Sequence, residues 1–187
     1  MRIISGNFKG KKIHQPLDIK TRPLKDLTKE SIFNLIIHSN KFSVDISSSE
    51  ILDLFSGIGS FGIECLSRGA KHVTFVENYR GVLAVLKKNL ANLKSIKNYL
   101  IIEEDALNNL NIKITKKNYD IIFLDPPYKE NKLNNLISLI LHKKILKNDG
   151  IIIIHRHKKE KDIFPKEFRV VEEKKYGISK IIFGTYS

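Results

Sequence analysis

Residues 51–62 read Ile-Leu-Asp-Leu-Phe-Ser-Gly-Ile-Gly-Ser-Phe-Gly, and this stretch decides the fold class. Its apolar first half is typical of a buried strand, its glycines of a tight turn, and its last residues of a helix start. Gly57, Gly59 and Gly62 satisfy the pattern G-x-G-x-x-G, in which glycines let the backbone approach a ligand that a Cβ would repel. The stretch therefore predicts a cofactor loop in an α/β fold.

Acidic residues on neighbouring predicted strands identify the cofactor class. Glu77 ends the predicted strand 72–77, where this fingerprint places a carboxylate that holds ribose hydroxyls. Asp53 lies just before the glycines, and its charge would repel the pyrophosphate of a dinucleotide. S-adenosylmethionine (SAM) carries a sulfonium and an ammonium instead, which an acidic strand end attracts. The order Asp-x-Phe-x-Gly, which includes Phe55, therefore favours SAM, with NAD as the weakest alternative.

A third acid follows the predicted strand 99–103. In a doubly wound sheet the end of this strand borders the same crevice, so Asp105, next to Ala106, is a candidate acceptor for the adenine amine. A lone acid in a charged segment is also typical of a solvated surface. The assignment of Asp105 and Ala106 to the cofactor site rests on their position alone.

The segment 119–128, Tyr-Asp-Ile-Ile-Phe-Leu-Asp-Pro-Pro-Tyr, predicts a rigid corner at a strand end. Proline cannot donate to a sheet ladder and restricts the residue before it, so the strand must stop at Asp125. The corner presents the Asp125 carboxylate, backbone carbonyls such as that of Pro126, and the Tyr128 ring. These groups would suit a flat ring that bears an amino group, such as a nucleobase. A Pro-Pro turn with a solvated aspartate is the plain alternative.

Strands and helices alternate from residue 50 onward, which predicts a doubly wound, mostly parallel sheet of seven strands with helices on both faces. We expect a terminal antiparallel hairpin in 168–186 and an N-terminal extension made of a small β-hairpin and a helix to about residue 38. The chain is accordingly divided into an extension, 1–40, and a main domain, 41–187. The predicted strands and helices of the main domain are 51–55, 59–68, 72–77, 81–93, 99–103, 119–124, 133–146 and 150–155.

Composition excludes several classes of function. The 187 residues contain no apolar run of about 18, so no membrane span is expected, and no apolar leader opens the chain. The single cysteine, Cys65, is typical of a reducing cytoplasm and of a buried structural thiol. His155 and His157 have no cysteine or third histidine nearby, so no metal site is expected. A cytoplasmic monomer is the default expectation.

The formal net charge of +13 favours a polyanionic partner. Lysine, isoleucine and asparagine are all abundant, however, so a base-composition bias of the coding DNA is an alternative source of the charge. The positions of the basic residues are more informative than the net charge, because these residues gather in 1–30. Candidate phosphate contacts there are Lys11, Lys12, Arg22 and Lys29.

With these residues in view, the chain resembles the class I SAM-dependent methyltransferases, and within them the RsmD family of 16S ribosomal RNA guanine-N2 methyltransferases. The resemblance covers nearly the whole chain. It is carried by Met1–Gly6, Gly10–Lys12, Arg22–Pro23, Lys29–Asn34, Asp53–Gly59, Leu66–Ala70, Phe123–Tyr128 and Tyr176–Gly177. The Asp-Pro-Pro-Tyr motif is shared by many amino methyltransferases, whereas the N-terminal signature and the Leu-Ser-Arg-Gly-Ala segment are more specific.

The resemblance implies methyl transfer from SAM to a guanine N2 amine of ribosomal RNA or of an assembling small subunit, with Asp125, Pro126 and Tyr128 at the acceptor. Five positions depart from the family pattern: Leu24 for Thr, Lys29 for Arg, His155 for Glu, and Ile178-Ser179 for Asp-Thr. Lysine keeps the charge of arginine but loses its bidentate geometry. An adenine-N6 methyltransferase and a non-catalytic RNA-binding or ribosome-assembly protein remain alternatives.

Overall fold

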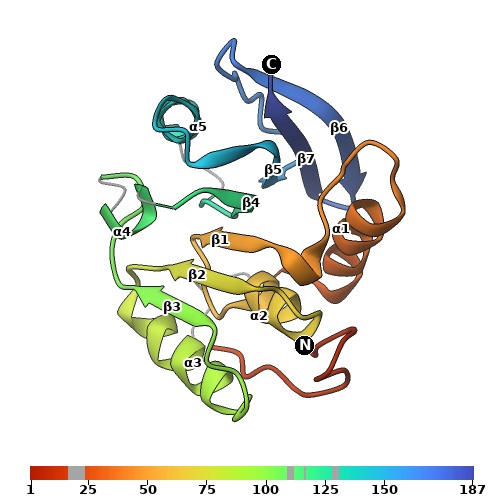
Figure 1. The fold of residues 1–187 in the computed structure, drawn as a ribbon, viewed down its shortest axis with the longest axis vertical. Coiled ribbons are helices and arrows are strands. Elements are labelled where there is room, and N and C mark those ends of the chain that lie inside the picture. The colour runs from red at the N-terminus through yellow and green to blue at the C-terminus, as the bar shows by residue number, and fades with distance from the viewer. Residues whose placement is uncertain (17–23, 109–111, 116, 128–130) are drawn as a thin grey trace.

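A seven-stranded sheet forms the centre of the protein (Figure 1) in the order β3-β2-β1-β4-β5-β7-β6. The computed structural model describes residues 1–16, 24–108, 112–115, 117–127 and 131–187. The first five strands run parallel, and β7 is antiparallel to both β5 and β6. The strands are β1 Glu50–Leu54, β2 His72–Val76, β3 Tyr99–Ile102, β4 Tyr119–Leu124, β5 Leu146–His157, β6 Phe168–Tyr176 and β7 Ser179–Tyr186.

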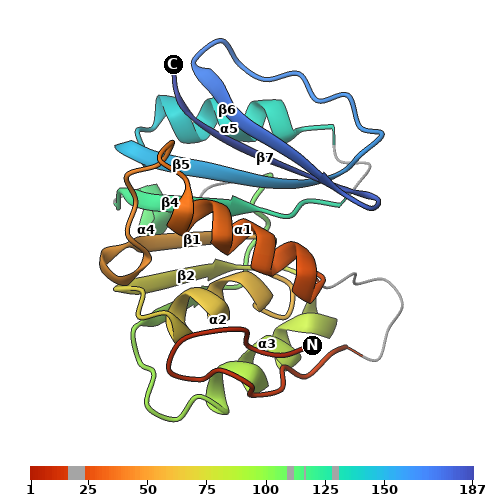
Figure 2. The ribbon, with the colours of Figure 1, turned by 90° about the vertical axis from the view of Figure 1, so that its right-hand side faces the viewer.

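Helices cover both faces of this sheet. Figure 2 shows α1, α2 and α3 on one face and α4 and α5 on the other. The helices are α1 Asp26–His38, α2 Ser60–Ser67, α3 Arg80–Ala91, α4 Ile112–Thr115 and α5 Leu133–His142, with a short 3-10 turn η1 Ile46–Ser48. The doubly wound, mostly parallel sheet predicted from the sequence is therefore confirmed.

The alternation of side chains along the central strands divides the core into two layers. On β4, Ile121 and Phe123 pack toward α1 and α2, whereas Ile122 and Leu124 pack toward α5. Successive residues of a strand point to opposite faces, so both layers are apolar and the strands read as continuous apolar runs. The same alternation places Asp53 of β1 on the α2 face, where its carboxylate bonds Gly62.

The boundary between α5 and β5 differs from the expected one. The helix predicted over 133–146 ends at His142, and Leu146 already begins β5. Lys144 adopts a left-handed φ of 52° while Ile145 N–H donates to the Ile140 carbonyl, which is a Schellman-type helix end. Glycine usually marks such an end, and none stands here.

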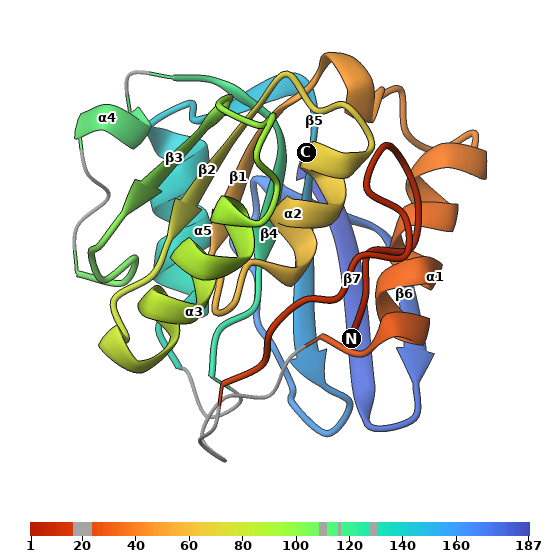
Figure 3. The same cartoon turned by 90° about the horizontal axis from the view of Figure 1, so that it is seen from below.

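The N-terminal segment, where a small hairpin was expected, folds back on itself through the antiparallel bridge of Arg2 with Lys12, and the N–H groups of Ile3 and Ile13 donate across it to the carbonyls of Lys11 and Met1. Figure 3 shows this segment beside α2. The buried Glu64 of α2 accepts the backbone N–H groups of Ile4 and Ser5, at 2.8 and 2.9 Å. These bonds attach the loop to α2.

Membrane-spanning helices and metal clusters were sought throughout the described part of the chain. No helix there is long and apolar enough to cross a bilayer. No group of three or more histidine, cysteine, aspartate or glutamate side chains there is arranged to hold a metal ion.

Candidate active site

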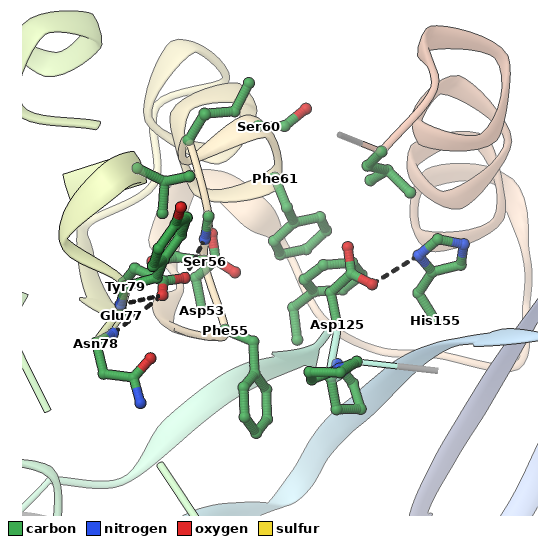
Figure 4. A pocket seen from close by; sticks show the side chains of 17 residues that line it. Asp53, Phe55, Ser56, Ser60, Phe61, Glu77, Asn78, Tyr79, Asp125 and His155 are labelled. Atoms are coloured by element: carbon green, nitrogen blue, oxygen red, sulfur yellow. Dashed lines mark hydrogen bonds and ion pairs between the residues drawn. The ribbon is translucent and has the colours of Figure 1, made fainter. Parts of the chain in front are cut away.

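A cavity of about 410 Å³ lies at the carboxyl ends of β1, β2, β4 and β5. This is the edge of a doubly wound sheet where ligands bind. Figure 4 shows Glu77 on one side of the cavity and Asp125 with His155 on the other. The lining residues are Leu24, Asp53, Phe55, Ser56, Gly57, Ile58, Ser60, Phe61, Glu77, Asn78, Tyr79, Val82, Phe123, Asp125, Pro126, Pro127 and His155.

Glu77 holds the glycine loop in place. Its Oε2 accepts the Gly57 N–H at 2.7 Å, and its Oε1 accepts the N–H groups of Asn78 and Tyr79 at 3.0 and 2.8 Å. A carboxylate oxygen has two acceptor positions, so Oε2 can accept a second hydrogen bond beside that of Gly57. Glu77 and Gly57, which the sequence assigned to one site, are thus in direct contact.

Asp53 is a buried carboxylate with an unsatisfied oxygen that belongs to the cavity wall. The residue is 1% exposed, its Oδ2 accepts the Gly62 N–H at 2.9 Å, and its Oδ1 has no partner among the described residues. Burial raises the pKa of Asp53 well above its ordinary value, and the nearby carboxylates of Asp125 and Glu77 add to the effect, against the Gly62 bond. An unpaired buried oxygen of this kind fits a cationic ligand.

The loop itself is conformationally strained and tightly packed. Phe55, whose ring lines the cavity, has a φ of 58°, which is rare for a bulky residue and is typical of functional sites. Gly59 has a φ of 83°, and a Cβ on it would come within 2.5 Å of Leu86. A Cβ on Gly62 would meet the Phe75 ring at 2.3 Å, so helix and strand approach closely only because this residue is glycine.

The Asp-Pro-Pro corner follows β4 as expected and forms the opposite wall. Asp125 Oδ1 lies 2.8 Å from Nδ1 of His155, which stands on the adjacent strand β5. The next residue, Arg156, donates to the carbonyl of Pro127 at 3.1 Å. The carboxylate and the backbone of the corner are therefore both held by β5.

Other predicted cofactor residues lie elsewhere. The carboxylate of Asp105 accepts the Leu107 N–H and the Asn108 side-chain amide, both at 2.9 Å, and so closes its own turn. Neither Asp105 nor the buried Ala106 is among the described residues that line the cavity. Their part in cofactor binding stays a prediction, and Tyr128 falls outside the described residues.

The structure corrects the expected surface role of Lys29. Its side chain is fully buried, with Nζ 3.5 Å from Glu64 Oε2 and 2.9 Å from the Arg2 carbonyl. It cannot reach a phosphate from this position. Lys11 and Lys12 are exposed as expected, and Arg22 falls outside the described residues.

Sequence reasoning missed the two side chains that hold the Asp125 carboxylate from β5 and β7, which are His155 and, behind it, Ser179. His155 was noted as a departure from the family pattern and as a histidine without metal-binding partners, and Ser179 only as a departure. The Oγ of Ser179 lies 2.8 Å from Nε2 of His155. Strands β4, β5 and β7 bring Asp125, His155 and Ser179 together from distant parts of the chain. No local sequence motif therefore contains these contacts. The signal in the sequence was that both residues depart from the family pattern.

Comparison with known proteins places the chain in a family. The family profile described as conserved hypothetical protein 95 matches residues 1–185, and several curated relatives that match the chain are named ribosomal RNA small subunit methyltransferase D. The chain therefore belongs to the RsmD family. Membership makes it a class I methyltransferase by fold, in agreement with the order of its strands.

Individual relatives of this RsmD protein match over most of their length. Ribosomal RNA small subunit methyltransferase D of Haemophilus influenzae is 36% identical, covering 95% of this chain and 90% of the relative. Its counterpart in Buchnera aphidicola subsp. Acyrthosiphon pisum is 37% identical, with 92% and 86% covered. The solved structure of the Escherichia coli candidate methyltransferase yhhF matches with a TM-score of 0.81 and 28% identity, over 100% and 98% of the two chains.

Proposed function

We propose that this protein transfers the methyl group of SAM to the exocyclic N2 amine of a guanine in small-subunit ribosomal RNA. The observation that carries the proposal is that one cavity has the glycine loop and Glu77 on one side and the Asp125–Pro127 corner on the other. Methyl donor and acceptor amine must meet in one site, and this cavity offers groups suited to each. Membership of the RsmD family and the names of the relatives support ribosomal RNA as the substrate class.

The wall formed by the glycine loop suits SAM in its charge and in its hydrogen-bonding groups. The unpaired Oδ1 of Asp53 is an acceptor for a cationic amine, and the remaining acceptor position of Glu77 Oε2 is one for a ribose hydroxyl. SAM supplies an electrophilic methyl group attached to a positively charged sulfur when it is bound. Asp53, Phe55, Gly57 and Glu77 would hold and orient it, with Gly59 shaping the turn.

The corner suits an amino group on a planar ring. The N2 lone pair of guanine is delocalised into the ring, which makes the amine a weak nucleophile. Asp125 and the Pro126 carbonyl would accept its two N–H bonds and draw the nitrogen toward tetrahedral geometry, aligned with the methyl carbon. The nitrogen–carbon bond forms as the carbon–sulfur bond breaks, and the cationic product nitrogen then gives one proton to Asp125.

Exposed cations of the N-terminal loop would hold the RNA. Lys11 and Lys12 lie on the N-terminal loop, and Met1 of the same loop contacts Ser60 of the cavity lining through its sulfur, at 3.2 Å. Contacts of this kind attract phosphates without reading sequence. A guanine would be turned out of its stack to enter the cavity, and Tyr128 is our candidate for stacking on it.

Analysis of the methylated nucleoside tests this proposal. Small-subunit ribosomal RNA from cells that lack the protein is incubated with SAM and the purified chain, then digested and examined by mass spectrometry. Formation of N2-methylguanosine is the expected result. N6-methyladenosine would make the protein an adenine methyltransferase instead, and SAM binding with no transfer to RNA or subunits would indicate a non-catalytic role.

A further inference from the structure

His155 lies beside Asp125 because of the register of the central strands. Phe123 and Leu124 of β4 pair with Ile153 and Ile154 of β5, so the next residues, Asp125 and His155, extend the ladder side by side. The side chains are 21% and 7% exposed, and His155 Nδ1 is 2.8 Å from Asp125 Oδ1. This contact is therefore built by the sheet and not by a surface loop.

Both ring nitrogens of His155 are engaged. Nε2 lies 2.8 Å from the hydroxyl of Ser179, which opens the antiparallel strand β7. An ionised carboxylate only accepts hydrogen bonds, so toward an ionised Asp125 the Nδ1 atom donates. Contacts at both nitrogens fix the rotation of the imidazole, and the imidazole in turn fixes one oxygen of Asp125.

The backbone of the same corner is held by the next residue of β5. Arg156, 3% exposed, donates from Nη1 to the Pro127 carbonyl at 3.1 Å and from Nε to Asp162 at 2.8 Å. Lys180 of β7 pairs with Asp162 at 3.0 Å. The backbone of the corner is thus anchored separately, and the carboxylate of Asp125 takes its orientation from His155.

We propose that His155 is the positioning residue for Asp125, and that Ser179 orients the ring for this task. With Oδ1 bound to His155, the other carboxylate oxygen, which Figure 4 shows directed away from the ring, is presented to the acceptor amine. This inference rests on the proposed function, because it assigns Asp125 to the amine. Without His155 the carboxylate can rotate, and fewer bound amines are aligned for transfer.

Three replacements of His155 separate positioning from general structural support. In His155→Asn the side-chain amide reaches the place of Nδ1 and can still donate to Asp125, whereas in His155→Gln the amide reaches the place of Nε2. His155→Ala removes both contacts. His142→Ala is the matched control, since His142 is an exposed histidine at the end of α5 on the opposite face of the sheet.

The experiment measures kcat and KM for RNA methylation, the Kd of SAM and the melting temperature of each variant. Loss of the hydrogen bond that orients the carboxylate should lower the kcat of His155→Ala by about 10- to 100-fold. The Kd of SAM and the KM for RNA should stay within about twofold. His155→Asn should recover most of kcat, His155→Gln should not, and His142→Ala should match the parent.

Several results would overturn the inference. A kcat of His155→Ala within twofold of the parent would do so, as would equal activities of the Asn and Gln variants, or a parallel loss of SAM binding. If His155→Ala fails to fold, Ser179→Ala decides, with a several-fold lower kcat and unchanged SAM binding expected and an unchanged kcat counting against the inference. Absence of methyl transfer by the parent protein would refute the proposed function and the inference with it. If the parent protein is active, a failed prediction for the variants counts only against the role of His155.

Discussion

Lys29 and Glu64 form an ion pair with no solvent exposure on either side chain, 3.5 Å apart. Glu64 also receives the N–H groups of Ile4 and Ser5, and Arg68 Nε at 3.0 Å. Burial lowers the pKa of Lys29, although the charge of Glu64 opposes the shift. A lysine that sequence alone assigned to RNA therefore joins α1, α2 and the N-terminal loop.

Replacing Lys29 should affect stability more than RNA affinity. Lys29→Met removes the charge that faces the buried Glu64, and breaking a buried pair costs about 3–5 kcal/mol, the lower end being expected here because Arg68 remains. Urea unfolding measures the loss, with the exposed Lys12→Ala expected within about 0.5 kcal/mol of the parent. A fully stable Lys29→Met that binds RNA poorly would return Lys29 to the RNA surface.

Lys11 and Lys12 should contribute to RNA binding through charge alone. The double variant Lys11→Ala/Lys12→Ala should weaken binding and reduce the slope of log affinity against log salt by about 2, since each phosphate contact contributes roughly 1. Lys174→Ala/Lys175→Ala, which removes two exposed lysines from the edge strand β6, is the control of equal charge. Equal slopes for the two double variants would attribute the effect to total charge and not to the N-terminal loop.

Asp53 should couple SAM binding to pH. Its pKa is raised by burial, so between the ordinary value of an aspartate and the raised value the native protein holds a proton that the unfolded chain has lost. The free energy of unfolding without ligand therefore falls as pH rises through this window. A cation bound beside Asp53 favours the ionised form, so stabilisation by SAM should increase over the same window.

Asp53→Asn tests this coupling, because the amide oxygen can still accept the Gly62 N–H. The variant should be at least as stable as the parent at neutral pH, should bind SAM about 10-fold more weakly, and should lose the pH-dependent gain in melting temperature with SAM. Thermal unfolding from about pH 5 to pH 8, with and without SAM, measures all three quantities. A SAM-induced gain that is independent of pH in the parent would count against Asp53 as the cation's partner.

Glu77 and Asp105 should differ in their effect on SAM affinity. Glu77→Ala leaves three loop N–H groups without their acceptor and removes the candidate ribose contact, so the Kd of SAM should rise by about 10- to 100-fold. Asp105 lies outside the described lining of the cavity, and Asp105→Ala should change the Kd less. Calorimetric titration compares the two, and equal losses would support the assignment of Asp105 to adenine.

Local sequence patterns predicted the parts of the site that depend on local geometry. The glycine turn, Glu77 at the end of β2 and the proline-limited end of β4 all follow from steric rules within a few residues. The parallel alternation then brings Glu77 and Asp125 to one edge of the sheet. The end of α5 was missed because Lys144 takes the left-handed conformation without a glycine to mark it.

Tertiary contacts explain the rest of what sequence could not show. Lys29 looks like a surface cation in the sequence, and only the packing of α1 on α2 reveals that Glu64 faces it. His155 meets Asp125 through the pairing of β5 with β4, over 30 residues of chain, and Ser179 meets His155 through the pairing of β5 with β7, over 24. Pairings of this range are set by the whole sheet and leave no local signal.

Asp125→Ala tests the central claim, which is that one cavity holds the methyl donor on one side and the acceptor amine on the other. SAM affinity and methyl transfer to small-subunit ribosomal RNA are measured on the same preparation of the variant and the parent. The account predicts a Kd of SAM within about twofold of the parent and a loss of transfer by about 100-fold or more. Methyl transfer by Asp125→Ala at the rate of the parent would contradict it.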